Sequence, residues 1–91
     1  MKRIHVYIYG EIVQGVFFRA NINAKANELD ITGYVKNNDD GSVEAVFEGD
    51  ESDVNELVDY CKEGPRGAKI EDIETVDEDY KGEFDDFEIR Y

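Results

Sequence analysis

Apolar residues recur at two different spacings along this chain, and the order of those spacings restricts the fold more than any other feature. In residues 3–9, Ile4, Val6 and Ile8 alternate with polar or aromatic side chains, which is typical of a strand with one buried face. In residues 18–29 the apolar side chains recur every three or four positions, which is typical of a helix with one buried face. The same patterns predict strands at residues 33–37, 42–48, 69–77 and 87–91, and a helix capped by Asp50 or Ser52 that runs to about residue 63.

The resulting order, β-α-β-β-α-β with a short last strand, predicts an α+β ferredoxin-like sandwich: an antiparallel sheet with two helices on one face. Each strand is expected to have one buried and one solvated face. Asn38-Asp39-Asp40-Gly41 indicates a hairpin turn, and residues 79–86 are expected to form an acidic loop. Because 91 residues suffice for one modest core, residues 1–91 are expected to form a single domain.

The net charge of −13 is unevenly distributed. Residues 1–45 hold six acids and five bases, whereas residues 46–91 hold seventeen acids and five bases. Phosphates of DNA or RNA would be repelled, so we expect no nucleic-acid partner. The acidic half is interpreted as a solvated surface that keeps the protein soluble, with adaptation to a salty cytoplasm as an alternative.

No apolar run matches a signal peptide or the roughly 20 residues of a membrane span, so we expect a cytoplasmic protein with no membrane partner. The single cysteine, Cys61, cannot form an internal disulfide, in agreement with a reducing compartment. We expect a monomer.

Several kinds of catalytic site are disfavoured by the residue types present. Cys61 belongs to the apolar stripe of the second predicted helix and is interpreted as an inert core thiol. His5 is the only histidine, and it is expected on the outward face of a strand as an ordinary surface residue. The acidic runs 77–79 and 85–86 lack the spacing of a calcium loop. We therefore expect no metal, no cofactor, no cysteine nucleophile and no Ser-His-Asp triad.

The loop between the first predicted strand and helix is the remaining candidate. Backbone N–H groups at a helix N-terminus converge on anions, and Gly15 lets the chain approach closely. Arg19 supplies a charged planar fork suited to phosphate. From these residues alone, a tight turn followed by a surface arginine remains the alternative.

Two motifs in this sequence resemble the signatures of the acylphosphatase family. The first is Val13-Gln14-Gly15-Val16-Phe17-Phe18-Arg19. The second is Gly33-Tyr34-Val35-Lys36-Asn37, followed by Gly41-Ser42-Val43 and Gly49 at the family's spacing. The resemblance covers nearly the whole chain, and the family's fold is the ferredoxin-like one.

The resemblance implies hydrolysis of the carboxyl–phosphate bond of small acyl phosphates, without metal or covalent intermediate. Asn37 takes the place of the family's water-orienting asparagine, and Arg19 that of its phosphate-binding arginine. The phosphate-binding residues implied are Gln14, Gly15, Val16, Phe17, Phe18 and Arg19. Because the leaving carboxylate has a conjugate acid with a pKa of about 4, it departs without a general acid. Acetyl, carbamoyl and glyceroyl phosphates all carry the group that the loop would bind.

One departure from the family lies at Gly10-Glu11-Ile12, where Glu11 stands at a position that is usually glycine. The extra residue is expected to form a harmless bulge, and the alternative is that Glu11 turns toward the phosphate and repels it. That alternative favours a binding module with little catalysis. One variant of the binding-module alternative is the similar domain found in carbamoyl-transfer maturation factors, although 91 residues leave no room for their other parts. A further alternative is a protein that binds partners through its acidic half. We also expect the Tyr91 carboxylate to pair with Arg19 if the last strand ends near the loop.

Overall fold

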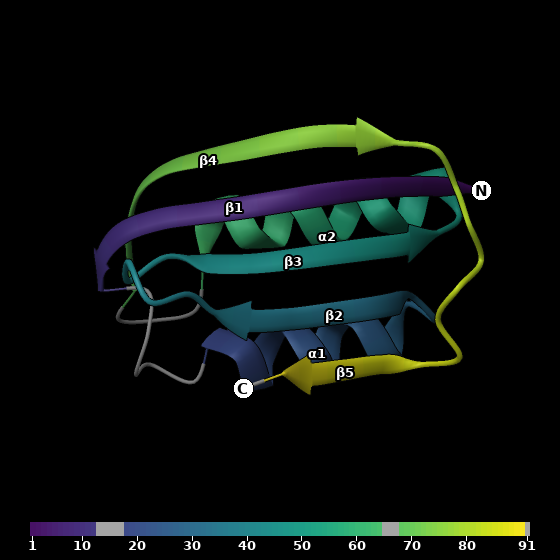
Figure 1. Cartoon of the computed structure of the whole chain (residues 1–91), viewed down its shortest axis with the longest axis horizontal. Coiled ribbons are helices and arrows are strands. Elements are labelled where there is room, and N and C mark those ends of the chain that lie inside the picture. Colours follow the sequence, from purple (N-terminus) through teal and green to yellow (C-terminus); the bar gives the residue numbers. More distant parts are fainter. Residues whose placement is uncertain (13–17, 65–67, 91) are drawn as a thin grey trace.

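A computed structural model describes residues 1–12, 18–64 and 68–90 of the chain. The predicted order of elements is confirmed (Figure 1). The elements are β1 (Lys2–Ile12), α1 (Phe18–Glu28), β2 (Thr32–Asn37), β3 (Val43–Gly49), α2 (Glu51–Glu63), β4 (Lys69–Glu78) and β5 (Phe87–Arg90). Among these residues no helix is long and apolar enough to cross a membrane.

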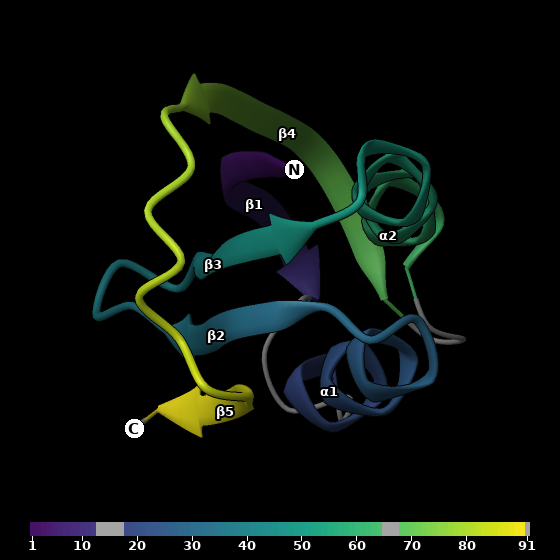
Figure 2. The ribbon, with the colours of Figure 1, turned by 90° about the vertical axis from the view of Figure 1, so that its right-hand side faces the viewer.

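The five strands form one sheet in the order β4-β1-β3-β2-β5, and both helices cover the same face of it (Figure 2). The ferredoxin-like α+β fold is therefore confirmed. The expectation of a purely antiparallel sheet is wrong at one edge, because β5 pairs with β2 in parallel. Alternation along a strand shows which face is buried but not which neighbour it pairs with, so the sequence pattern could not reveal this pairing.

The core lies between the sheet and the helices, and the predicted buried faces of β1, β2, β3, α1 and α2 are confirmed, whereas no side chain of β4 is fully buried. Each Val, Leu, Ile or Phe side chain moved out of water here contributes about 1.5–3 kcal/mol of hydrophobic free energy. The sheet contributes Ile4, Val6, Ile8, Val35, Val43, Ala45 and Phe47, α1 contributes Phe18, Ile22 and Ala26, and α2 contributes Val54, Leu57, Val58 and Cys61.

β1 continues through the segment expected to open a loop. It ends at Ile12 rather than near Gly10, because β4 remains paired with it after two shifts of register. The shifts fall between Tyr9 and Gly10 and between Gly10 and Ile12. The backbone at Glu11 is therefore accommodated as a bulge in the strand, as expected for the extra residue.

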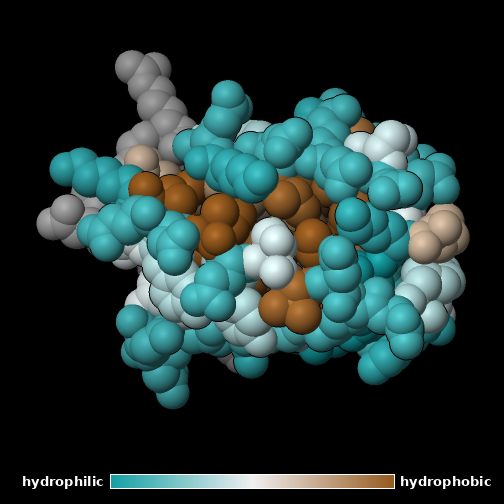
Figure 3. Space-filling model, turned by 90° about the horizontal axis from the view of Figure 1, so that it is seen from above, coloured by the Kyte–Doolittle hydropathy of each residue, from teal (hydrophilic) through white to brown (hydrophobic). Residues whose placement is uncertain are grey.

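The opposite face of the sheet is only partly solvated. Val46 and Glu48 of the central strand β3 are 1% exposed, so the expectation of one solvated face fails for this strand. Glu48 is covered because residues 79–86 cross this side of the sheet (Figure 2), where the Lys81 N–H donates to the Glu48 carboxylate. The edge strand β4 is different: viewed from above, apolar atoms show between hydrophilic side chains (Figure 3), and Val76 is 47% exposed.

Gly33 in β2 is a position where only glycine fits. Its φ is 140°, and an added Cβ would lie 1.8 Å from the carbonyl oxygen of Val46 on β3. We expect Gly33→Ala to lower the free energy of unfolding by about 3 kcal/mol, because the strands must separate to admit the methyl group. Gly49→Ala is the matched control, since its Cβ would meet no atom closer than 3.4 Å. Urea denaturation measures the free energy of unfolding of both variants. Equal and small losses would show that β2 and β3 leave room for a Cβ at Gly33.

Candidate active site

The predicted site residues that the structure describes, Phe18, Arg19 and Asn37, lie at one end of the molecule. β2 and β5 run toward this end and finish at Asn37 and Arg90, and α1 begins there at Phe18 (Figure 1). Phe18, Arg19 and Asn37 are therefore brought to one end of the sheet. The predicted phosphate-binding residues Gln14, Gly15, Val16 and Phe17 lie outside the described residues.

The N-terminus of α1 suits an anion. The first four N–H groups of a helix have no acceptor within the helix, and the helix dipole places partial positive charge there. The first turn of α1 contains no acidic residue, whereas α2 carries Glu51 and Asp53 in its first turn. Phe18, which is 2% exposed, anchors the start of α1 in the core. In this acidic protein, α1 thus presents a helix start without acidic side chains beside Arg19.

The Arg19 guanidinium contacts the end of the last strand. Its Nη1 donates a hydrogen bond of 3.4 Å to the backbone carbonyl oxygen of Arg90. This length is at the outer limit for such a bond, so the contact orients the side chain without holding it rigidly. The expected partner of Arg19, the Tyr91 carboxylate, lies outside the described residues.

Asn37 carries a buried side-chain oxygen that lacks a described hydrogen-bond partner, as Asn23 and Glu48 also do. It is the last residue of β2, and its backbone pairs with Val43 of β3. Its side-chain Oδ1 is buried, and none of the described residues donates a hydrogen bond to it. Buried polar atoms are nearly always paired, so such an atom calls for an explanation. A buried acceptor held at the end of a strand is suited to hold a water molecule.

The hairpin turn after Asn37 is fixed by its own hydrogen bonds. The Asn38 N–H donates to the Ser42 carbonyl oxygen at 2.8 Å. Asp40 Oδ1 accepts from the Ser42 hydroxyl at 2.6 Å and from the Ser42 N–H at 2.9 Å. The bond from the Ser42 side chain, followed by that from its backbone, lowers the pKa of Asp40. Asn37 is therefore followed by a well-braced turn.

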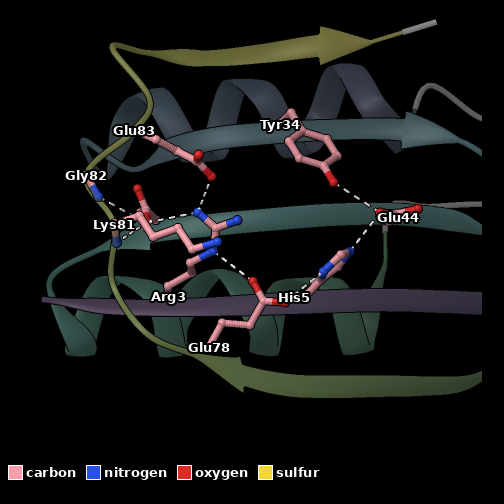
Figure 4. Close-up of polar contacts among 9 residues, drawn as sticks. Arg3, His5, Tyr34, Glu44, Glu78, Lys81, Gly82 and Glu83 are labelled. Carbon is pink, nitrogen blue, oxygen red and sulfur yellow. Dashed lines mark hydrogen bonds and ion pairs between the residues drawn. The ribbon is translucent and has the colours of Figure 1, made fainter.

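Cys61 is placed as expected, whereas His5 lies on the expected outward face of β1 but is largely covered. Cys61 is fully buried, and burial raises the pKa of its thiol, which makes it an inert core residue. The prediction that His5 is an ordinary surface residue is wrong (Figure 4). Its Nε2 lies 2.7 Å from Glu44 Oε2, its Nδ1 lies 3.2 Å from Glu78 Oε2, and its ring stacks on Tyr7. The pairing of β1 with both β3 and β4 brings these carboxylates to His5, and sequence alternation does not predict it.

The bonds around Glu44 belong to the same face of the sheet. Burial of Glu44 opposes ionisation, but hydrogen bonds from His5 and Tyr34 hold the pKa of its carboxyl below the ordinary value. Burial, and then the bond to Glu44, raise the pKa of Tyr34 to about 12. These groups sit on the side of the sheet away from the helices, and they are not brought together with Arg19 and Asn37 in any described contact.

Comparison with known proteins agrees with the motifs. The family model described as Acylphosphatase matches residues 4–89. A protein named acylphosphatase from Syntrophus aciditrophicus is 50% identical over 91 residues, which cover 100% of this chain and 94% of that protein. One from Haloarcula marismortui is 45% identical, covering 98% of this chain and 96% of its own.

Solved structures agree as well. The crystal structure of acylphosphatase from Bacillus subtilis superposes with a TM-score of 0.94 at 33% identity, over 100% of both chains. A structure of full-length HypF in its phosphate- and nucleotide-bound form also matches, with a TM-score of 0.89 at 30% identity. That match covers 99% of this chain but 12% of HypF.

Proposed function

We infer the roles of individual residues from the premise that this chain belongs to the acylphosphatase family. It hydrolyses the carboxyl–phosphate bond of acyl phosphates and releases a carboxylate and inorganic phosphate. The observation that supports the residue roles is that Arg19, the N-terminus of α1 and Asn37 lie at the same end of the sheet, and that no described residue donates a hydrogen bond to Asn37 Oδ1.

Arg19 and the loop amides hold the phosphoryl group. The guanidinium of Arg19 binds two phosphoryl oxygens, and the amides of residues 14–18 bind those oxygens from the helix side. The charge that spreads over the phosphoryl oxygens in the transition state meets donors already in place, so little reorganisation is needed at the moment of reaction.

Asn37 positions the attacking water. Its Oδ1 accepts a hydrogen bond from the water, which directs an oxygen lone pair at phosphorus opposite the leaving carboxylate. As the P–O(water) bond forms and the P–O(acyl) bond breaks, a phosphoryl oxygen takes the water's proton. The carboxylate leaves with the bonding electron pair and needs no proton, because its conjugate acid has a pKa of about 4. The mechanism therefore requires no histidine, cysteine or metal.

Release of phosphate from benzoyl phosphate in the presence of EDTA tests this mechanism. We expect the same rate with and without the chelator, because binding and positioning by protein groups account for the reaction. A rate that falls with EDTA and returns on adding a divalent cation would refute the metal-free mechanism. Binding of inorganic phosphate without turnover would favour the binding module instead.

Composition and topology also bear on the domain organisation, oligomeric state and partners of the protein. We propose that residues 1–91 act as one domain and as a monomer in the cytoplasm, and that the net charge of −13 keeps nucleic acids from binding. The small acyl phosphate is the only partner that this site requires.

A further inference from the structure

Residues 79–86, here called the strap, connect the two edges of the sheet. They leave β4 at one edge, cross the face opposite the helices, and enter β5 at the other edge (Figure 2). The strap contains no strand or helix, so side chains must hold it in place. The crossing lies at the end of the sheet opposite Arg19 and Asn37 (Figure 1).

Glu48 and Arg3 anchor the strap to the sheet (Figure 4). The Glu48 side chain is fully buried, and its Oε2 accepts from the backbone N–H groups of Lys81 at 3.0 Å and Gly82 at 3.3 Å. The same oxygen accepts from Arg3 Nη1 at 3.2 Å. Arg3 Nη1 also reaches Glu83 Oε1 at 2.5 Å. All of the bonds to the Glu48 carboxylate go to Oε2, whereas its Oε1 accepts from no described residue. Because a buried charge needs such partners, the bonds to Oε2 favour one position for the strap.

The position of the strap determines where β5 begins to pair with β2. Phe84 packs edge-on against Tyr34 of β2, with ring centroids 6.0 Å apart, and the Arg3 guanidinium lies 5.4 Å from its ring centre. Two residues later, the Asp86 carbonyl oxygen accepts from the Gly33 N–H at 3.1 Å and begins the parallel pairing of β5 with β2. The register of β5 is thus set at the strap's end.

β5 in turn contacts the candidate active site. It has four residues, and among the described strands it pairs only with β2, so its position also depends on Phe87, which is buried against the core, and on the strap. Its final carbonyl, that of Arg90, accepts from Arg19 Nη1. A small shift of β5 along β2 therefore moves one of the groups that contact Arg19.

We propose that Glu48 and Arg3 are positioning residues for phosphate binding, which act on Arg19 through the strap and β5. The proposal rests on the phosphate-binding role given to Arg19 above. It predicts a larger effect on substrate affinity than on the chemical step, because the Arg19 guanidinium is displaced and not removed, and because Asn37 is held separately by β2 and the Asn38–Ser42 turn.

The test variant is Glu48→Gln, which keeps the size of the side chain but removes the charge that Arg3 and the strap amides bind. Inorganic phosphate is titrated by calorimetry, and KM and kcat are measured with benzoyl phosphate. We expect Kd and KM to rise about threefold to tenfold and kcat to stay within about twofold. Phe84→Leu weakens the ring contact between the strap and Tyr34 of β2. It should therefore also raise Kd and KM while leaving kcat within about twofold, and it tests the proposal even if Glu48→Gln does not fold.

Two comparisons decide the outcome. Val54→Ala removes buried apolar volume on the helix side of the sheet without touching the strap, and it should leave the phosphate Kd unchanged. In an Arg19→Ala background, Glu48→Gln should have no further effect on Kd, because the residue through which it acts is absent. An equal effect in both backgrounds, or none in the wild type, would overturn the proposal. If Arg19→Ala alone left phosphate affinity unchanged, the proposed role of Arg19 itself would fail.

Discussion

Arg19→Ala is expected to lower kcat/KM for benzoyl phosphate by about 10²–10³-fold, because one preorganised charged donor to the transferred group is lost. The same donor binds the phosphoryl group in the ground state. The Kd of inorganic phosphate should therefore rise about tenfold to a hundredfold, as expected for hydrogen bonds to a charged group. Steady-state kinetics and calorimetry measure the two effects.

Lys25→Ala is the matched control for Arg19→Ala. It removes one positive charge from the same helix, but Lys25 lies in the last turn of α1 and pairs with Glu28 and Glu56. If general electrostatic attraction brought the phosphate to this acidic protein, both variants would weaken binding alike. We expect Lys25→Ala to leave both constants near the wild-type values.

Asn37→Ala should lower kcat by about 10²–10³-fold while changing the Kd of inorganic phosphate by less than about twofold. The asymmetry arises because Asn37 holds the water and Arg19 holds the phosphate. Removing the Asn37 carboxamide also removes a buried acceptor that no described group satisfies, so the variant should be at least as stable as the wild type.

Asn27→Ala, on the exposed surface of α1, controls for the loss of an asparagine carboxamide. It should leave kcat unchanged. A kcat for Asn37→Ala near the wild-type value would show that the water is oriented by another group.

The sequence predicted the helices, the strands and their buried faces because these depend on local periodicity. The apolar positions of β1, from Ile4 to Ile8, show this. Periodicity carries no information on which strands pair, so it missed the parallel edge strand β5 and the contacts of His5 with Glu44 and Glu78. It also missed the burial of Glu48, whose partners are the Arg3 side chain and two backbone N–H groups, all more than thirty residues away in the chain.

The candidate site was identified by motif more than by local chemistry. A glycine and an arginine at a strand–helix junction indicate little by themselves, and the second motif ending in Asn37 gave the site its specificity. The structure brings Arg19 and Asn37 to one end of the sheet and adds two features that no motif contained: an Asn37 Oδ1 that accepts from none of the described residues, and the contact between Arg19 and the Arg90 carbonyl. Both depend on how distant segments meet, which is why the sequence could not reveal them.

Arg19 is proposed to bind the phosphoryl group and Asn37 to orient the attacking water. The affinity of inorganic phosphate for the two alanine variants tests these separate roles most directly. Calorimetric titrations under identical conditions should show Kd raised at least about tenfold in Arg19→Ala and within about twofold of wild type in Asn37→Ala. Equal losses of affinity in the two variants, or a larger loss in Asn37→Ala, would contradict the account.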